Sequence, residues 1–210
     1  MQQATSNRNA KQSRTRVALH RGVSLVEILF VVAILGIVAV GAVTLFEPDL
    51  VNELENAADV VVADVERARN LAVANNSQYK FTFNTDGSGY FFKHSGTNTA
   101  LNTLPASPYS QRSDAADRQT TLLKELPGLR NVDLIGAVQV AGSVREQVAD
   151  LEFSSAGATS RSQATEIWLA AGSGTSRRYR VVTVNPTTGL ANVGAIAGAL
   201  PTIGAGTSGS

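Results

Sequence analysis

The sequence predicts an α+β protein in which a long N-terminal helix is followed by a domain of antiparallel strands. Residues 23–77 carry helical patterns throughout, first as an apolar run and then as an amphipathic stripe. Residues 78–193 hold short alternating segments separated by turns rich in Gly and Asn, as expected of an antiparallel sheet. The chain has 210 residues, which suits one modest domain with appendages.

The apolar run follows a basic leader, residues 1–22, which contains no acid. From Ile28 to Phe46 no residue is charged, and as a helix this run spans roughly 28 Å, close to the thickness of a bilayer core. The basic leader predicts a cytoplasmic N-terminus and a body across the membrane. A secretory signal peptide has a shorter apolar core ending at a small-residue cleavage site, so we favour a transmembrane helix over 23–47.

Glu27 lies inside this apolar segment, and a plain membrane anchor gives no reason for it. A charged residue at the centre of a bilayer costs on the order of 2.5–3.5 kcal/mol, and less near an end, so it normally has a partner. If the chain were cut after Gly22, Val23 would become a cationic N-terminus four residues before Glu27. The two groups point apart within one first turn. The expected partner is therefore the amine of a neighbouring subunit.

The stretch "RGVSLVEILFVVAILGIVAV", residues 21–40, resembles the class III signal of type IV pilins and type II secretion pseudopilins. In that pattern Gly22 precedes the cleavage site, Val23 is the new N-terminus, and Glu27 is the acid of the family motif. Val23 departs from the usual Phe. The resemblance implies that a prepilin peptidase cleaves after Gly22 and methylates Val23. It also implies assembly through Glu27.

The same resemblance implies a location and a set of partners. The protein would be a single-pass inner-membrane protein with a cytoplasmic N-terminus and a periplasmic globular domain, found in the filament after assembly. Its partners would be other pseudopilins or pilins, the prepilin peptidase, an inner-membrane assembly platform and inner-membrane lipid.

An amphipathic helix is expected over 48–77, with Pro48 loosening its join to the first helix. Apolar residues recur at spacings of three and four and form one stripe: Leu54, Ala58, Val61, Val65, Ala68 and Ala72. The charged residues lie mainly off that stripe: Glu53, Glu55, Asp59, Asp64, Glu66, Arg67 and Arg69. Asn75-Asn76-Ser77 is expected to end the helix.

A β-rich domain is expected over 78–193, beginning with a hairpin of 79–83 and 90–94 around the turn "NTDGSG". Further strands are expected at 132–140, 150–153, 165–170, 179–184 and 190–193, the last two joined by the turn "NPTTG". Residues 95–120 have no period and predict a surface loop. Residues 194–210 are rich in Gly and Ala and predict a flexible tail.

Three segments resemble more narrowly the H-type minor pseudopilin and its type IV pilus relatives. They are "ADVERARNLAVANNSQYKFTF" (63–83), "LEFSSAGATS" (151–160) and "RRYRVVTVNPTTGLANV" (177–193). We therefore expect a structural minor pseudopilin of a type II secretion pseudopilus, which supports filament assembly, the filament tip and protein export. The alternative is a minor type IV pilin, including one that binds DNA in natural transformation. A third interpretation is a plain anchored binding domain.

The sequence does not favour an enzyme, and we expect no metal and no cofactor. It has no cysteine, and its two histidines, His20 and His94, are isolated, so zinc and nucleophilic sites lack their residues. We expect His94 at the surface. Major pseudopilins bind calcium through acids near the C-terminus. No acid follows Glu166 here, which argues against such a calcium site and against a major-pseudopilin role.

An arginine cluster, Arg177, Arg178 and Arg180, is the one candidate for a weak anion or partner contact. Some DNA-uptake relatives hold phosphate with a C-terminal Gly-Arg-x-Arg motif, but here the matching turn reads "TGLANV". Without the leader, 13 basic and 17 acidic residues remain, a net charge of −4. Three arginines on such a chain do not favour nucleic-acid binding.

Overall fold

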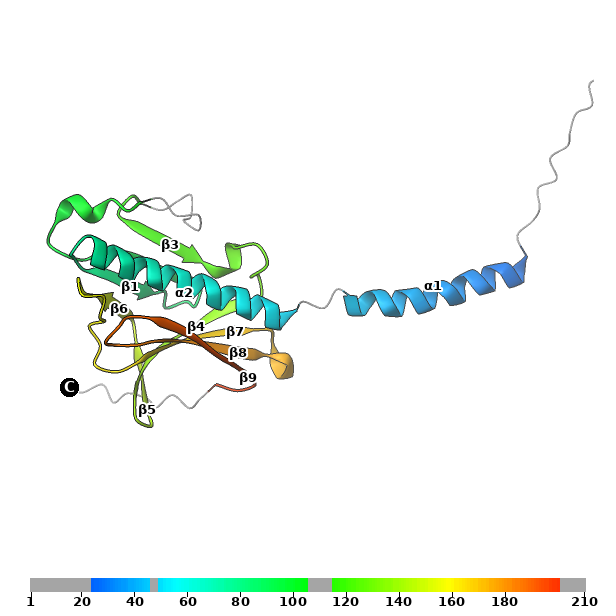
Figure 1. The fold of residues 1–210 in the computed structure, drawn as a ribbon. Coiled ribbons are helices and arrows are strands. Elements are labelled where there is room, and N and C mark those ends of the chain that lie inside the picture. Colours follow the sequence, from blue (N-terminus) through cyan, green and yellow to red (C-terminus); the bar gives the residue numbers. More distant parts are fainter. Residues whose placement is uncertain (1–23, 46–48, 106–114, 201–210) are drawn as a thin grey trace, which may run out of the picture. The chain divides into compact units, whose positions relative to one another are not determined.

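The computed structural model describes residues 24–45, 49–105 and 115–200, with side chains of the first segment described for 24–36. The chain forms two compact units, Met1–Glu47 and Pro48–Ser210, and each is described by itself. The first unit contains one helix, α1 (Leu25–Leu45). The second, which we call the body, is an α+β domain with one long helix, α2 (Leu50–Ala74), and nine strands (Figure 1).

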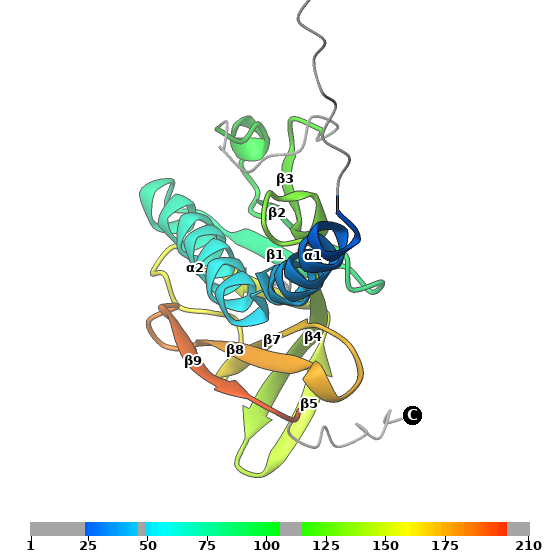
Figure 2. The same cartoon turned by 90° about the vertical axis from the view of Figure 1, so that its right-hand side faces the viewer.

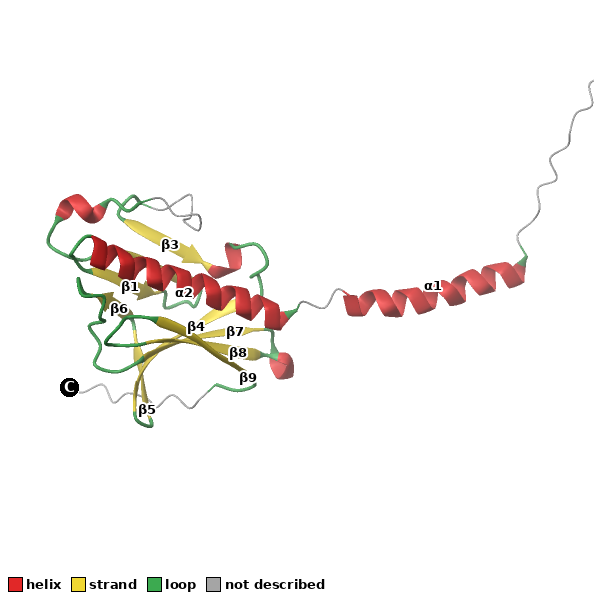
Figure 3. Cartoon of the chain, viewed as in Figure 1, coloured by secondary structure: helices red, strands yellow, loops and turns green. Residues whose placement is uncertain are grey.

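The strands of the body form two antiparallel sheets (Figure 3). Four strands in the order β3-β2-β1-β6 make the first sheet: β1 (Tyr79–Phe83), β2 (Gly89–His94), β3 (Arg118–Leu122) and β6 (Asp150–Phe153). Five strands in the order β5-β4-β7-β8-β9 make the second: β4 (Val132–Ala141), β5 (Val144–Val148), β7 (Thr165–Ala171), β8 (Arg178–Val184) and β9 (Ala191–Ala197). Three short 3-10 helices lie between strands: η1 (Thr99–Asn102), η2 (Leu123–Glu125) and η3 (Gly174–Ser176).

Helix α2 has capping interactions at both ends, and it ends at the expected Asn75-Asn76-Ser77 stretch. Asp49 is the N-cap, and its carboxylate accepts a hydrogen bond from the amide of Asn52 at 3.2 Å. At the other end Asn76 has a φ of +46°, and the amide of Ser77 donates to the carbonyl of Ala72 at 3.0 Å. A left-handed residue directly after the last turn is a common way for a helix to end.

Helix α2 packs against strands of both sheets, with contacts to β1 and β6 of the first and to β4, β7, β8 and β9 of the second. Figure 2 shows the helix beside the layered strands from a second direction. All six residues of the expected apolar stripe are buried, which confirms that prediction. Ala57 and Asp64 are buried as well, because a helix that packs against two sheets is covered over a wider arc than one on a single sheet.

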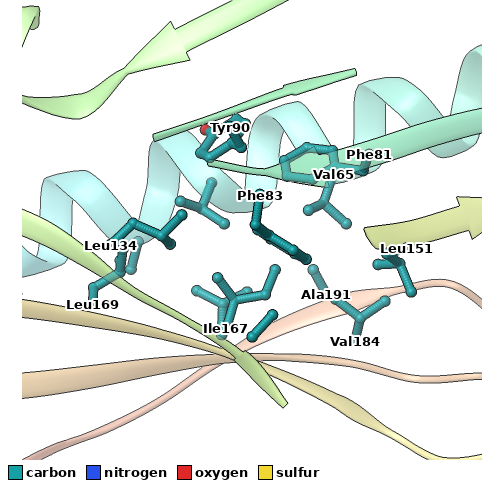
Figure 4. Close-up of a cluster of buried hydrophobic side chains, with 14 of the residues drawn as sticks. Val65, Phe81, Phe83, Tyr90, Leu134, Leu151, Ile167, Leu169, Val184 and Ala191 are labelled. Atoms are coloured by element: carbon teal, nitrogen blue, oxygen red, sulfur yellow. The ribbon is translucent and has the colours of Figure 1, made fainter. Parts of the chain in front are cut away.

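One continuous apolar core joins the helix and the two sheets. Figure 4 shows Val65 of α2 next to Phe81 and Tyr90 of the first sheet, with Ile167 and Leu169 of the second sheet across the core from them. The ring of Phe81 stacks on that of Tyr90, with a centroid distance of 4.5 Å. Aromatic rings each bury a large apolar area, so such a stack stabilises the core.

The strands expected from the sequence are present, and two further strands were missed. β3 lies at the end of residues 95–120, which were expected to be loop, and β5 was not expected at all. Both are edge strands with polar sequences, RQTTL and VREQV. Edge strands often carry polar and charged residues. These two strands therefore lack the alternation of apolar and polar residues by which a strand is identified in a sequence.

The expected boundary of the flexible tail at residue 194 is wrong, because β9 continues to Ala197. Gly194 lies so close to β8 that a Cβ there would meet Val181 Cγ1 at 2.5 Å, so this glycine serves strand packing. The remainder of the expected tail, 201–210, lies outside the described residues, as do the leader and the centre of the expected surface loop, 106–114.

Candidate functional site: the first turn of the apolar helix

Helix α1 begins next to Ser24, whose side chain and carbonyl occupy the N-cap position. Ser24 Oγ accepts from the amide of Val26 at 3.3 Å, and the Ser24 carbonyl accepts from the amides of Glu27 and Ile28 at 2.9 and 3.1 Å. Glu27 is therefore in the first helical turn, where the helix dipole favours a negative charge. Its side chain is exposed.

The large apolar side chains of α1 whose placement is described are exposed all around the helix. They are Leu25, Val26, Ile28, Leu29, Phe30, Val31, Val32, Ile34 and Leu35, each at least half exposed. A helix that is apolar on every side is stable only when lipid or other helices cover it. The described surface of α1 is therefore suited to contact with lipid or other helices, and it carries the Glu27 carboxylate near its start.

The proposed cleavage and methylation positions, Gly22 and Val23, lie outside the described residues. Among the residues that are described, none of the helices is long and apolar enough to cross a membrane. The transmembrane helix expected over 23–47 extends beyond that part of the chain and stays a prediction.

The three clustered arginines lie around the start of β8 and do not point into one common patch. Arg180 Nη1 contacts Glu55 Oε1 of α2 at 3.1 Å. Arg177 lies 3.9 Å from Asp133 Oδ2 and over the ring of Tyr179, 5.6 Å from its centroid. Arg178 Nη1 donates to the carbonyls of Thr175 and Arg177. Each guanidinium thus already has a partner of its own, and η3 lies in the turn just before them.

Asp64 is buried, although the sequence pattern grouped it with the charged residues off the apolar stripe. Its side chain is 1% exposed and accepts three hydrogen bonds from strands of the first sheet. Tyr90 OH and Thr121 Oγ1 donate to Oδ2 at 2.9 and 2.7 Å, and Gln119 Nε2 donates to Oδ1 at 3.1 Å. Its spacing of seven residues from Ala57 was the available signal, since both lie on the edge of the buried arc.

His94 is buried, so the expectation of a surface histidine is wrong. Its Nε2 lies 2.7 Å from Ser77 Oγ and its Nδ1 lies 2.8 Å from Asn102 Oδ1. Its ring lies edge-on to the ring of Tyr79, and the two ring centroids are 5.2 Å apart. These contacts join the end of α2 to η1 and make His94 a structural residue. Across the described residues, no group of His, Cys, Asp and Glu side chains could hold a metal ion.

Comparison with known proteins gives two similar crystal structures and one sequence motif. Both structures are of the type IV minor pilin FimU of Pseudomonas aeruginosa PAO1, in space groups P21 and P65. The first has 15% identity and a TM-score of 0.44 over 69% of this chain and 90% of FimU. The second has 16% identity and a TM-score of 0.41 over 68% of this chain and 93% of FimU.

No curated protein matches the chain by sequence. Residues 18–43 match the family model of the prokaryotic N-terminal methylation motif. This span contains Gly22, Val23 and Glu27 and most of α1. The chain therefore carries a prokaryotic N-terminal methylation motif at the start of its apolar helix.

Proposed function

We propose that the protein is a non-enzymatic subunit of a pilus-like filament. The observation that carries this proposal is the N-terminal methylation motif over 18–43, joined to an apolar helix that displays Glu27 in its first turn. A subunit of this kind is held in the inner membrane by the apolar helix, with its N-terminus in the cytoplasm and its body in the periplasm. It then enters a filament in which such helices pack together.

Cleavage after Gly22 would create the charge that Glu27 needs. The new amine of Val23 is cationic, and a neighbouring subunit's Glu27 carboxylate can pair with it. Opposite charges a few Å apart attract far more strongly in an apolar environment than in water. The pair would therefore fix the axial offset between packed helices. Methylation of the amine keeps its positive charge.

Within this class we favour a minor pseudopilin of a type II secretion system, active in filament assembly, at the filament tip and in protein export. The support is the H-type resemblance of three segments. These segments form the α2–β1 junction, the turn after β6 and the β8–β9 hairpin. The second candidate is a minor type IV pilin. Secretion of exported proteins and formation of pili in a deletion strain would separate the two.

The test of filament assembly uses the full chain, expressed in a host with a prepilin peptidase and partner subunits. We expect an intact mass that begins at Val23 and carries one methyl group. Glu27→Ala should still be inserted and cleaved, yet it should no longer crosslink to partner subunits. Glu125→Ala, which removes an exposed acid of the body, is the matched control and should crosslink normally.

Two results would contradict the proposal. One is a mature chain that still starts at Met1 in a host with an active peptidase. The other is normal crosslinking of the Glu27→Ala variant, which would show that the charge pair does not hold the helices in register.

A further inference from the structure

Asp64 occupies the junction between α2 and the edge of the first sheet. Among the described strands, β3 is an edge strand that pairs only with β2. Two of its five residues, Gln119 and Thr121, turn inward and are buried, and both donate to the Asp64 carboxylate. Tyr90 of β2 donates to the same group. One carboxylate thus joins the helix to two neighbouring strands.

The partners of Asp64 can serve both the charged and the protonated carboxyl group. Oδ2 lies between two hydroxyls, and a hydroxyl can donate or accept after a simple rotation. When Oδ2 is protonated, it can therefore donate a hydrogen bond to the hydroxyl of Tyr90 or Thr121 without movement of the heavier atoms. Oδ1 continues to accept from Gln119 in either state. The carboxyl group can thus bind a proton without losing its hydrogen-bond partners.

Among the residues that the structure describes, few charged groups lie around Asp64. From its own helix, Arg67 acts on the carboxylate through its positive charge, while Arg67 Nη2 donates to the carbonyl of Pro105 at 2.9 Å. From β2 the titratable partner is the Tyr90 phenol, and from β3 the partners are the neutral Gln119 and Thr121. The dominant influence is burial, which raises the pKa of Asp64 above its ordinary value of 3.8. The three hydrogen bonds and Arg67 offset that effect only in part.

We propose that Asp64 is a proton-binding joint through which pH controls how firmly the edge strand β3 is held on α2. The folded protein takes up a proton at this carboxyl group, and the packing of β3 is firmest when the proton is bound. As pH rises and the proton leaves, a negative charge remains in the buried interface, and the strand is held less firmly.

The direction of the pH dependence follows from linkage. A carboxyl group that binds its proton more tightly in the folded than in the unfolded chain stabilises the folded state in acid. This contribution is fully present below the pKa of the unfolded chain, about 3.9 for Asp, and is lost as pH rises through the raised pKa of the folded chain. Within that window the folded-to-unfolded ratio falls up to about tenfold for each pH unit.

The test measures urea unfolding of the full chain in detergent micelles over a series of pH values. Trp168 is the only tryptophan and lies buried in β7 of the body, so its fluorescence reports unfolding of the body alone. Asp64→Asn imitates the protonated group in size and charge. We expect its urea midpoint to equal the wild-type midpoint in acid and to exceed it increasingly as pH rises.

Two further variants separate proton binding from a purely structural role. Asp59→Asn removes an exposed acid of the same helix and should follow the wild type at every pH. Thr121→Val removes a donor that favours the charged form, so its loss of stability should grow as pH rises. A loss that is the same at all pH values would overturn the proposal, as would an Asp64→Asn variant less stable than the wild type near neutral pH.

A direct titration of the wild-type chain removes any dependence on how a variant folds. Carbon-13 NMR of labelled Asp side chains should place the titration midpoint of Asp64 above about 3.9, the pKa of Asp in an unfolded chain. An Asp64 midpoint at that value or below it would show that the buried group binds no extra proton, and the proposal would be wrong.

Discussion

Glu27 and Asp64 are both acids on helices, yet their surroundings differ. Glu27 is exposed at the start of an apolar helix, where we propose that it meets the amine of another chain. Asp64 is enclosed by three donors of its own chain. We propose that the enclosed acid acts on folding and the exposed acid on assembly. The spacing of the N-terminal motif predicts the proposed role of Glu27, whereas the burial of Asp64 follows only from the two-sheet architecture.

Gly189 gives a sharp test of packing at the scale of one residue. It has a φ of +65° in the turn between β8 and β9, and a Cβ there would collide with the carbonyl oxygen of Gly157. Gly189→Ala combines left-handed backbone strain with a clash against backbone, so we expect a loss of about 2–4 kcal/mol in the free energy of unfolding. Urea unfolding followed by Trp168 fluorescence measures this loss.

Gly142→Ala is the matched control for Gly189→Ala. Gly142 has nearly the same φ, +61°, but no atom lies within 4 Å of its would-be Cβ. Its substitution should therefore cost only the backbone term, about 1 kcal/mol. Equal losses for the two variants would show that the approach of the two turns at Gly157 and Gly189 contributes nothing.

At the scale of elements, α2 is fastened to the last hairpin by Arg69. Its Nε donates to the carbonyl of Thr188 at 2.6 Å, in the same turn that holds Gly189. A charged donor on a backbone carbonyl makes a strong hydrogen bond, though solvent weakens it at an exposed site. Arg69→Met keeps the aliphatic stem and removes the donor, so we expect a loss of about 1 kcal/mol in unfolding free energy.

The control for Arg69→Met is Arg130→Met, which removes an exposed arginine between η2 and β4. We expect it to change the free energy of unfolding by less than about 0.5 kcal/mol. Thermal or urea unfolding of both variants decides the matter. If Arg69→Met proves as harmless as Arg130→Met, the hydrogen bond to Thr188 does not hold the hairpin on the helix.

Elements were predictable from the sequence where burial follows a simple period. The stripe of α2 and the strand 79–83 were predicted at the observed positions because each buries alternate or helically spaced residues. β3 was not predicted because its inward side chains, Gln119 and Thr121, are polar partners of Asp64. The end of β9 was not predicted because Gly194 lies in a Gly/Ala-rich segment typical of a flexible tail, although this glycine lets β9 approach Val181.

At the scale of the whole molecule, the arrangement of charge bears on which macromolecules the protein can bind. The chain has a net charge of +1, and the leader contributes five of its basic residues. The three arginines of β8 and its preceding turn are held by Glu55, Asp133 and backbone carbonyls. A phosphate would have to displace these partners, which weakens the case for DNA further than composition alone.

The mature full chain in detergent should therefore bind DNA weakly. Affinity for duplexes grows with the number of phosphates neutralised, with a log–log salt slope of about −0.9 per phosphate. Three arginines give a slope no steeper than about −3 and an affinity at the weak end of non-specific binding, with a Kd near 10⁻⁴ M at physiological salt, as an order of magnitude. Titrations against duplex and single-stranded DNA at two salt concentrations measure both quantities. Arg177→Ala combined with Arg178→Ala removes two of the three arginines, so it should make the salt slope shallower and the binding weaker still. Low-micromolar binding that this double variant abolishes would instead favour the minor type IV pilin of DNA uptake over the secretion pseudopilin.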